Sequence, residues 1–172
     1  LRRPGRRVEL VPQQHRGLTG HALGLVAVAL ALVPGWAPVV AVATATTGFA
    51  ITGYSVHDRL GGDAALARLR ERLRTRGLRL LLDFVPNHTG LDHPWVEEHP
   101  EYYIQGTEQD LAHAPQNYAW ITRTRGDLLL AHGRDPYFPG WPDPLQLDYA
   151  NPATQEAMIS QLVKIAGQCD GV

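Results

Sequence analysis

The sequence predicts an α/β fold with a parallel sheet, and three consecutive features carry this prediction. An amphipathic helix over residues 63–77 leads without a break into an almost unbroken apolar run at residues 78–85. A second helix follows at residues 151–168. A helix followed at once by a buried strand is typical of an α/β unit. We therefore expect a parallel sheet with both faces covered.

The helix over residues 63–77 is indicated by its spacing and by its ends. Leu66, Leu69 and Leu73 recur at intervals of three and four residues, which predicts one buried stripe. Asp63 is placed as the N-cap, and Gly77 as the residue that ends the helix. The arginines between the leucines are expected to form a solvated outer face.

The second helix has an equally clear beginning. Asn151 is a good N-cap, and Pro152 suits the first turn because its missing N–H would be unpaired there anyway. The predicted buried stripe consists of Ile159, Leu162, Val163 and Ala166. The "CDGV" that follows this helix is expected to open another strand.

Composition limits the partners of the chain. The 172 residues carry a formal net charge of −1, and the pI is about 6.8, so no basic surface for nucleic acid or an anionic membrane is indicated. This charge balance is easier to reconcile with neutral small molecules or uncharged polymers as partners. The single cysteine, Cys169, cannot form an internal disulfide, so no oxidising compartment is indicated and a cytoplasmic location is slightly favoured over export.

The chain divides into four segments. Residues 1–48 are basic and then rich in Ala and Val, residues 49–88 form the first α/β unit, residues 89–150 lack periodicity, and residues 151–172 hold the last helix and the start of a strand. So long a stretch without periodicity is usually functional. We expect residues 89–150 to be an irregular insertion.

The first segment allows several interpretations. The apolar run Ala22 to Val33 has too few residues for a membrane-spanning helix, which needs about 20. With its basic start and small residues it imitates a signal peptide. A buried core segment and a coding artefact from a wrong reading frame are the alternatives. No membrane span is predicted.

Polar side chains gather where the apolar run ends, in "LRLLLDFVPNHTG". Asp83, Asn87 and His88 follow the strand, and in parallel α/β folds ligands bind beyond the carboxyl ends of strands. An acid, an amide and an imidazole can bind sugar hydroxyls, hold a metal or serve acid/base chemistry. They can also be structural, with Asp83 capping a loop and His88 buried.

Four motifs in order resemble those of the α-amylase superfamily, glycoside hydrolase family 13. They are "GYSVHD" (residues 53–58), "DFVPNH" (83–88), "LQLDYANP" (145–152) and "DGV" (170–172). The second has the form D-x-x-x-N-H of the family's first signature. The resemblance spans residues 49–172 and implies a partial (β/α)8 TIM barrel, from about strand 2 to strand 4, with an inserted domain B. Val8 to Val11 would then be the second barrel strand.

The resemblance implies a role for each matching residue. Tyr54 would stack on the sugar whose bond is cleaved, and His88 would hydrogen-bond its hydroxyls. Asp83 would support the strand end, and Asp58 its loop. Asn87 would correspond to an amide that coordinates calcium in many members.

One departure from the family pattern argues against a calcium site. Gln146 stands where calcium-binding members carry a carboxylate, so we expect that no cofactor is required, with calcium as the alternative. A zinc site of His88, His93 and His99 is not favoured, because their spacing fits no compact metal motif.

The tryptophans of the predicted insertion allow two interpretations. Trp95, Trp120 and Trp141 either line a sugar groove or form the core of the insertion.

The family's catalytic carboxylates have no counterpart here. Its retaining mechanism uses two carboxyl groups roughly 5 to 5.5 Å apart. In the family the nucleophile follows the stretch matched by "DGV", so both groups are expected beyond Val172. Asp170 would open the strand. We therefore assign no catalytic residue within this chain.

The expected function is that of a retaining glycosidase or transglycosylase acting on α-linked glucose oligosaccharides or polysaccharides, or on α-glucosides. This chain alone would be inactive. The alternative is a carbohydrate-binding remnant without catalysis.

Overall fold

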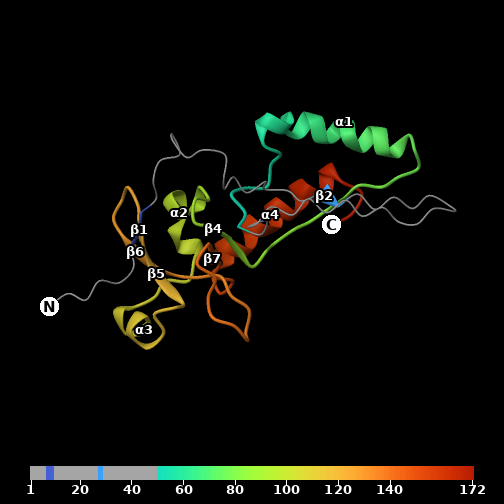
Figure 1. Ribbon diagram of the computed structural model, residues 1–172. Helices are drawn as coiled ribbons and strands as arrows, with labels where there is room; N and C mark the ends of the chain where they lie inside the picture. The colour runs from blue at the N-terminus through green and yellow to red at the C-terminus, as the bar shows by residue number, and fades with distance from the viewer. Residues whose placement is uncertain (1–6, 10–26, 29–49) are drawn as a thin grey trace.

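The computed structural model describes residues 7–9, 27–28 and 50–172 (Figure 1). In chain order its elements are β1 (Arg7–Glu9), β2 (Ala27–Val28), the 3-10 turn η1 (Asp58–Leu60), α1 (Gly62–Arg74), β3 (Leu81–Leu82), β4 (His88–Gly90), α2 (Trp95–Glu98), the 3-10 turn η2 (Pro100–Tyr102), α3 (Glu108–His113), β5 (Tyr118–Thr122), β6 (Leu128–Ala131), β7 (Pro144–Gln146) and α4 (Pro152–Gln168). No helix in this described part of the chain is long and apolar enough to cross a membrane.

Helix α1 confirms the predicted helix, but its N-cap is a different residue. Gly61, at φ +92°, turns the chain from η1 into α1 and takes the cap position. Asp63 already lies inside the helix, where its Oδ1 accepts a hydrogen bond from the Val56 N–H at 3.0 Å. The prediction of Asp63 as N-cap was therefore wrong, because the left-handed glycine begins the helix earlier.

The end of α1 agrees with the predicted stop, while its buried face is narrower than expected. Gly77 has a positive φ of 71°, and the Leu78 N–H next to it donates to the carbonyl of Leu73 at 3.0 Å. Leu66 is buried, but Leu69 is exposed. The leucine face of α1 is therefore less buried in the described chain than the leucine spacing predicts.

The strand expected at residues 78–85 is present only in part. β3 pairs antiparallel with β2, while Leu81 also forms a parallel bridge with Gly171. The Leu82 N–H donates to the carbonyl of Gly171 at 3.0 Å, and the Asp170 N–H to the carbonyl of Leu80 at 2.8 Å. The parallel relation between β3 and the segment after α4 is thus formed. The pairing with β2 was not expected.

Helix α4 begins as predicted, but it buries a different face. The side chain of Asn151 accepts the Ala153 N–H at 3.0 Å, and Pro152 is in the first turn. The buried residues are Thr154, Met158 and Ile165, whereas Ile159 and Val163 are exposed. The predicted stripe was wrong because the face of a helix that is buried depends on which elements lie against it, and spacing alone does not reveal that.

Residues 89–150 are more ordered than predicted. They contain three short helical segments and a β5–β6 hairpin, whose turn includes Gly126 at φ +110°. Thr107 and Asp110 form a reciprocal capping box at the start of α3. The prediction that this segment is irregular was therefore wrong in detail. Its strands are too short to show a clear hydrophobic period in the sequence. The capping pair, in contrast, could have been recognised from the sequence.

The strand predicted from Val8 to Val11 overlaps β1 at residues 8 and 9, and β1 does not pair with β3. It pairs parallel with β5, so that the sheet order is β1-β5-β6. The interpretation of this segment as the second barrel strand was therefore wrong. The other predictions for residues 1–48 lie outside the described residues, apart from β2.

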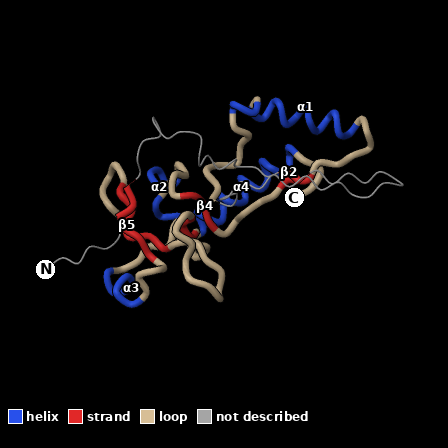
Figure 2. Tube along the Cα trace, in the orientation of Figure 1, coloured by secondary structure: helices blue, strands red, loops and turns tan. Residues whose placement is uncertain are grey.

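The buried core runs from the β5–β6 hairpin to α4. Its fully buried members include Leu80, Tyr103, Ile121, Leu130, Leu145, Leu147 and Ile165. Figure 1 shows the strands and short helices of residues 88–146 gathered at one end of the molecule, with α1 at the other and α4 running between them. Figure 2 shows the same division, with long continuous helices only in α1 and α4.

Candidate functional site

The polar strand end meets the last strand of the insertion. After β3 the chain passes through Asp83 and Asn87 into β4, which pairs antiparallel with β7. In this register His88 lies opposite Gln146. The first and last parts of residues 88–146 are therefore held together at one place, beside the predicted site.

His88 is buried at this junction and contacts an exposed tryptophan. Its side chain is 5% exposed, and its ring meets the indole of Trp141 edge to face at a centroid distance of 5.8 Å. Gly133 allows this arrangement because a Cβ there would lie 2.9 Å from the Cβ of His88. Trp141 is 42% exposed, so its indole remains accessible next to the imidazole.

Asn87 and Gln146 form a reciprocal amide pair. The Asn87 Nδ2 donates to Gln146 Oε1 at 3.2 Å, and the Gln146 Nε2 donates to Asn87 Oδ1 at 3.0 Å and to the Asn87 carbonyl at 2.9 Å. Asn87 Nδ2 also lies 3.2 Å from Nδ1 of His88. The amide pair therefore borders the imidazole directly.

Asp83 and Asp58, the two acids predicted to have supporting roles, are both exposed. The carboxylate of Asp83 accepts the N–H of the adjacent Phe84 at 2.9 Å, just after β3. Asp58 begins η1, where its carbonyl accepts the Gly61 N–H at 2.8 Å. Both contacts are local, and supporting roles for these residues stay a prediction.

Tyr54, the residue expected to stack on a sugar, is buried in the described part of the chain. It is 4% exposed, its ring packs on Phe84 at a centroid distance of 5.4 Å, and its hydroxyl donates to the Val85 carbonyl at 2.7 Å. Burial raises the pKa of its hydroxyl above the usual range. In the described residues the Tyr54 ring is therefore packed against Phe84, and its stacking on a sugar stays a prediction.

Sequence reasoning missed Tyr149 and the aromatic residues near Trp141. The hydroxyl of Tyr149 donates to the Pro86 carbonyl at 2.6 Å and so connects the segment before α4 to the strand end. Tyr137 and Phe138 are exposed, at 88% and 63%. The aromatic run in "DPYFPGW" was a usable signal, but only the structure shows that Trp141 of this run contacts His88.

The histidines considered for zinc have separate roles. His93 is buried and its Nδ1 accepts the Trp95 N–H at 3.2 Å, while His99 stacks on Tyr102 and pairs with Glu101. Burial lowers the pKa of His93 to about 4. In the described ranges no three His, Cys, Asp or Glu side chains gather closely enough to hold a metal ion.

Trp95 agrees with the second expected role, a place in the core of the insertion. Trp95 packs against the core and meets both His93 and Tyr102 edge to face. Trp120 lies in β5, partly buried. Of the three tryptophans in residues 89–150, Trp141 is the one that contacts His88.

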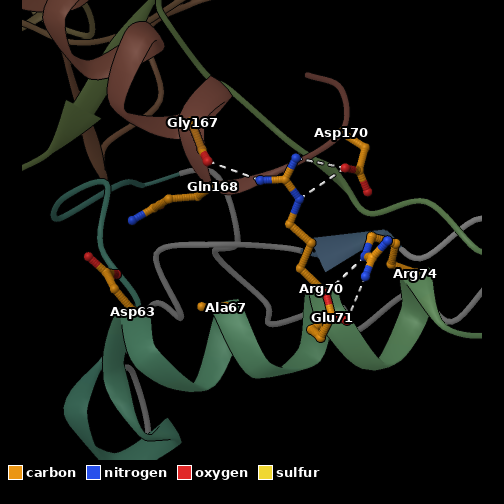
Figure 3. A pocket seen from close by; sticks show the side chains of 8 residues that line it. All are labelled: Asp63, Ala67, Arg70, Glu71, Arg74, Gly167, Gln168 and Asp170. Carbon is orange, nitrogen blue, oxygen red and sulfur yellow. Dashed lines mark hydrogen bonds and ion pairs between the residues drawn. The ribbon is translucent and has the colours of Figure 1, made fainter.

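A separate pocket lies between α1 and α4 (Figure 3). Arg70 crosses it, donating from Nε and Nη2 to Asp170 Oδ1 at 2.9 and 2.7 Å and from Nη1 to the Gly167 carbonyl at 3.0 Å. The other carboxylate oxygen of Asp170 accepts the Leu80 N–H at 2.9 Å. Asp170 is thus engaged where β3 begins, away from His88.

A family model matches most of the chain. The alpha-amylase catalytic domain matches residues 28–160, which is most of the chain. The chain belongs to the alpha-amylase catalytic domain family. The match begins within the Ala/Val-rich segment and includes β3, the strand end and the start of α4.

Curated members of the family resemble short stretches of the chain. Alpha-amylase SusG of Bacteroides thetaiotaomicron is 40% identical over 52 residues, covering 30% of this chain and 8% of that protein. An alpha-1,4-glucan:maltose-1-phosphate maltosyltransferase of Salinibacter ruber is 40% identical over 67 residues, covering 37% and 10%. An alpha-glucosidase of Apis mellifera is 37% identical over 65 residues, covering 33% and 12%. The matched part is thus a small share of each of these relatives.

Solved structures share the fold of this chain. Isomaltulose synthase from Klebsiella sp. LX3 aligns with a TM-score of 0.54 at 23% identity, covering 74% of this chain and 24% of that one. Alpha-amylase from H. orenii aligns with a TM-score of 0.50 at 22% identity, covering 75% and 28%. Both neighbours are TIM-barrel enzymes of the family.

Proposed function

We propose that this chain supplies the sugar-binding side of the active site in a retaining glycosidase or transglycosylase that acts on α-glucans or α-glucosides. The observation that carries the proposal is the position of His88, at the end of the β3 segment and beside the exposed indole of Trp141. Relatives named as amylase, glucosidase and maltosyltransferase support the substrate class.

The chemistry of the two side chains suits a pyranose. An imidazole can donate to or accept from sugar hydroxyls, and an indole face packs on the apolar face of a sugar ring. The edge-to-face contact with His88 fixes the tilt of the Trp141 ring. Tyr137 and Phe138, which precede Trp141 in the same loop, are also exposed.

We further propose that β3 and the segment after α4 are neighbouring strands of a (β/α)8 barrel. The parallel bridge between Leu81 and Gly171 supports this arrangement, and α4 then serves as the connecting helix. His88 would lie beyond the carboxyl end of a barrel strand, where active sites of this fold are found. Residues 89–150 would be the inserted domain B.

Sugar binding by the chain tests the proposal. Titration with maltoheptaose by calorimetry is expected to show that His88→Ala and Trp141→Ala each weaken binding at least about tenfold, which corresponds to about 1.4 kcal/mol. His113→Ala, which alters an exposed histidine of α3, is the matched control and should bind as the unmodified chain does. Equal affinity in all variants would contradict the proposed site.

Turnover separates catalysis from binding. We expect the chain alone not to hydrolyse a chromogenic α-glucoside, since no nucleophile is assigned within it. Turnover by this chain that His88→Ala abolishes would overturn that expectation.

A non-catalytic carbohydrate-binding role is the second candidate, favoured by the exposed aromatic residues around Trp141. Binding of maltoheptaose without turnover by the natural protein that contains this sequence would support the carbohydrate-binding role. Turnover by that protein would support the glycosidase or transglycosylase.

A further inference from the structure

The place where many family members coordinate calcium is built differently in this chain. Calcium takes six to eight oxygen ligands, and carboxylates normally provide much of the charge. The side-chain and carbonyl oxygens that meet at Asn87 come from Asn87 itself, Gln146 and Arg134, and all are uncharged. This donor set does not fit a calcium ion.

The oxygen that would face a cation already accepts hydrogen bonds. Gln146 Nε2 donates to Asn87 Oδ1 at 3.0 Å and to the Asn87 carbonyl at 2.9 Å. In return Gln146 Oε1 accepts from Asn87 Nδ2 at 3.2 Å and from the Arg134 N–H at 3.2 Å. A cation at coordination distance from Asn87 Oδ1 would have to displace the amide of Gln146.

The amide pair joins parts of the chain that are distant in sequence. Asn87 and Gln146 are 59 residues apart, and they connect the end of the β3 segment to β7. The bond between Arg134 and Gln146 adds the loop before β7. A metal ion with ligands in these segments would connect the end of the β3 segment to β7. The two amide groups make the same connection through hydrogen bonds between uncharged groups.

We propose that the Asn87–Gln146 amide pair, and not a calcium ion, holds the inserted segment to the strand end of this protein. Calcium would then have no preferred site in the folded state, and folding would not depend on its concentration. The inference stands apart from the proposed function, because it concerns stability and needs no sugar.

The unmodified chain provides the first test. Its thermal unfolding midpoint, followed by circular dichroism, is expected to be the same within about 1 °C in excess Ca²⁺ and in a chelator, since a ligand that does not bind the folded state does not stabilise it. A midpoint that rises with Ca²⁺ and falls in the chelator would overturn the proposal. This arm requires no variant and therefore cannot fail through misfolding.

A double-mutant cycle in the chelator tests the amide pair itself. Asn87→Ala and Gln146→Ala are each expected to lower the midpoint, and the double variant should unfold close to the single variants because either change already breaks the pair. Gln116→Ala, at an exposed glutamine, is the matched control. Fully additive shifts, or shifts at Gln146 no larger than at Gln116, would contradict the proposal.

Discussion

Residues 88–146 and the two long helices differ in how completely they bury their apolar side chains. The segment from β4 to β7 encloses Tyr103, Ile121 and Leu130, each of which is at most 2% exposed. Helix α4, by contrast, leaves Ile159 and Val163 exposed at 59% and 66%. Apart from Ile104 and the exposed aromatic residues Tyr137, Phe138 and Trp141, these short elements therefore form the better-packed part of the described chain.

The difference follows from geometry. The β5–β6 hairpin and the β4–β7 pair place side chains toward a common interior, and the cross-strand contacts are made within about 60 residues of chain. A helix with apolar residues on more than one side needs neighbours on each of those sides. In the described residues α4 has such neighbours mainly along Thr154, Met158 and Ile165.

The sharpest way to test this comparison is a pair of identical truncations. Leu130→Ala in β6 removes a side chain that is 0% exposed, and we expect it to cost about 2 to 5 kcal/mol. Leu162→Ala in α4, at 37% exposure, should cost less than about 1 kcal/mol. Urea unfolding midpoints of both variants check the difference, and equal losses would remove the distinction between the two regions.

A second test uses the buried histidine of the better-packed region. Burial lowers the pKa of His93 to about 4 in the folded chain, from 6.5 when exposed. Between these values the unfolded chain binds a proton that the folded chain does not, so stability falls as the pH falls from 6.5 towards 4. The loss is at most about 3 kcal/mol.

His93→Asn is the matched variant, because its Oδ1 can still accept the Trp95 N–H. Urea unfolding between pH 7 and pH 4 is expected to show a smaller pH dependence in this variant than in the unmodified chain. His99→Asn, at a more exposed histidine, is the control. If His93→Asn leaves the pH dependence unchanged, another group is responsible.

The smallest expected effect concerns the contact between α1 and the end of α4. Arg70→Lys keeps the charge but cannot reproduce the paired Nε and Nη2 contacts with Asp170, so it should lower the urea midpoint slightly. The pair is partly exposed, which keeps the effect below that of Leu130→Ala. Arg68→Lys on the exposed face is the control, and an equal midpoint in both variants would show that the contact contributes nothing.

Part of the candidate site could be predicted because it lies in one short stretch. Asp83, Asn87 and His88 follow directly after an apolar run, and the rule that ligands bind at strand ends identifies them. Trp141 could not be selected from three tryptophans, since its contact with His88 spans more than fifty residues. The covering of Tyr54 by Phe84 was equally hidden, because motif order carries no information on exposure.

By itself the sequence determined the family, the two long helices and the polar strand end, because each is encoded in spacing within a few residues. Only the tertiary structure decided the buried face of α4, the place of β1 beside β5 and the pairing of Asn87 with Gln146. These features depend on which distant segments meet. Such meetings are set by the path of the whole chain and by the need to pair buried polar groups, which no local pattern records.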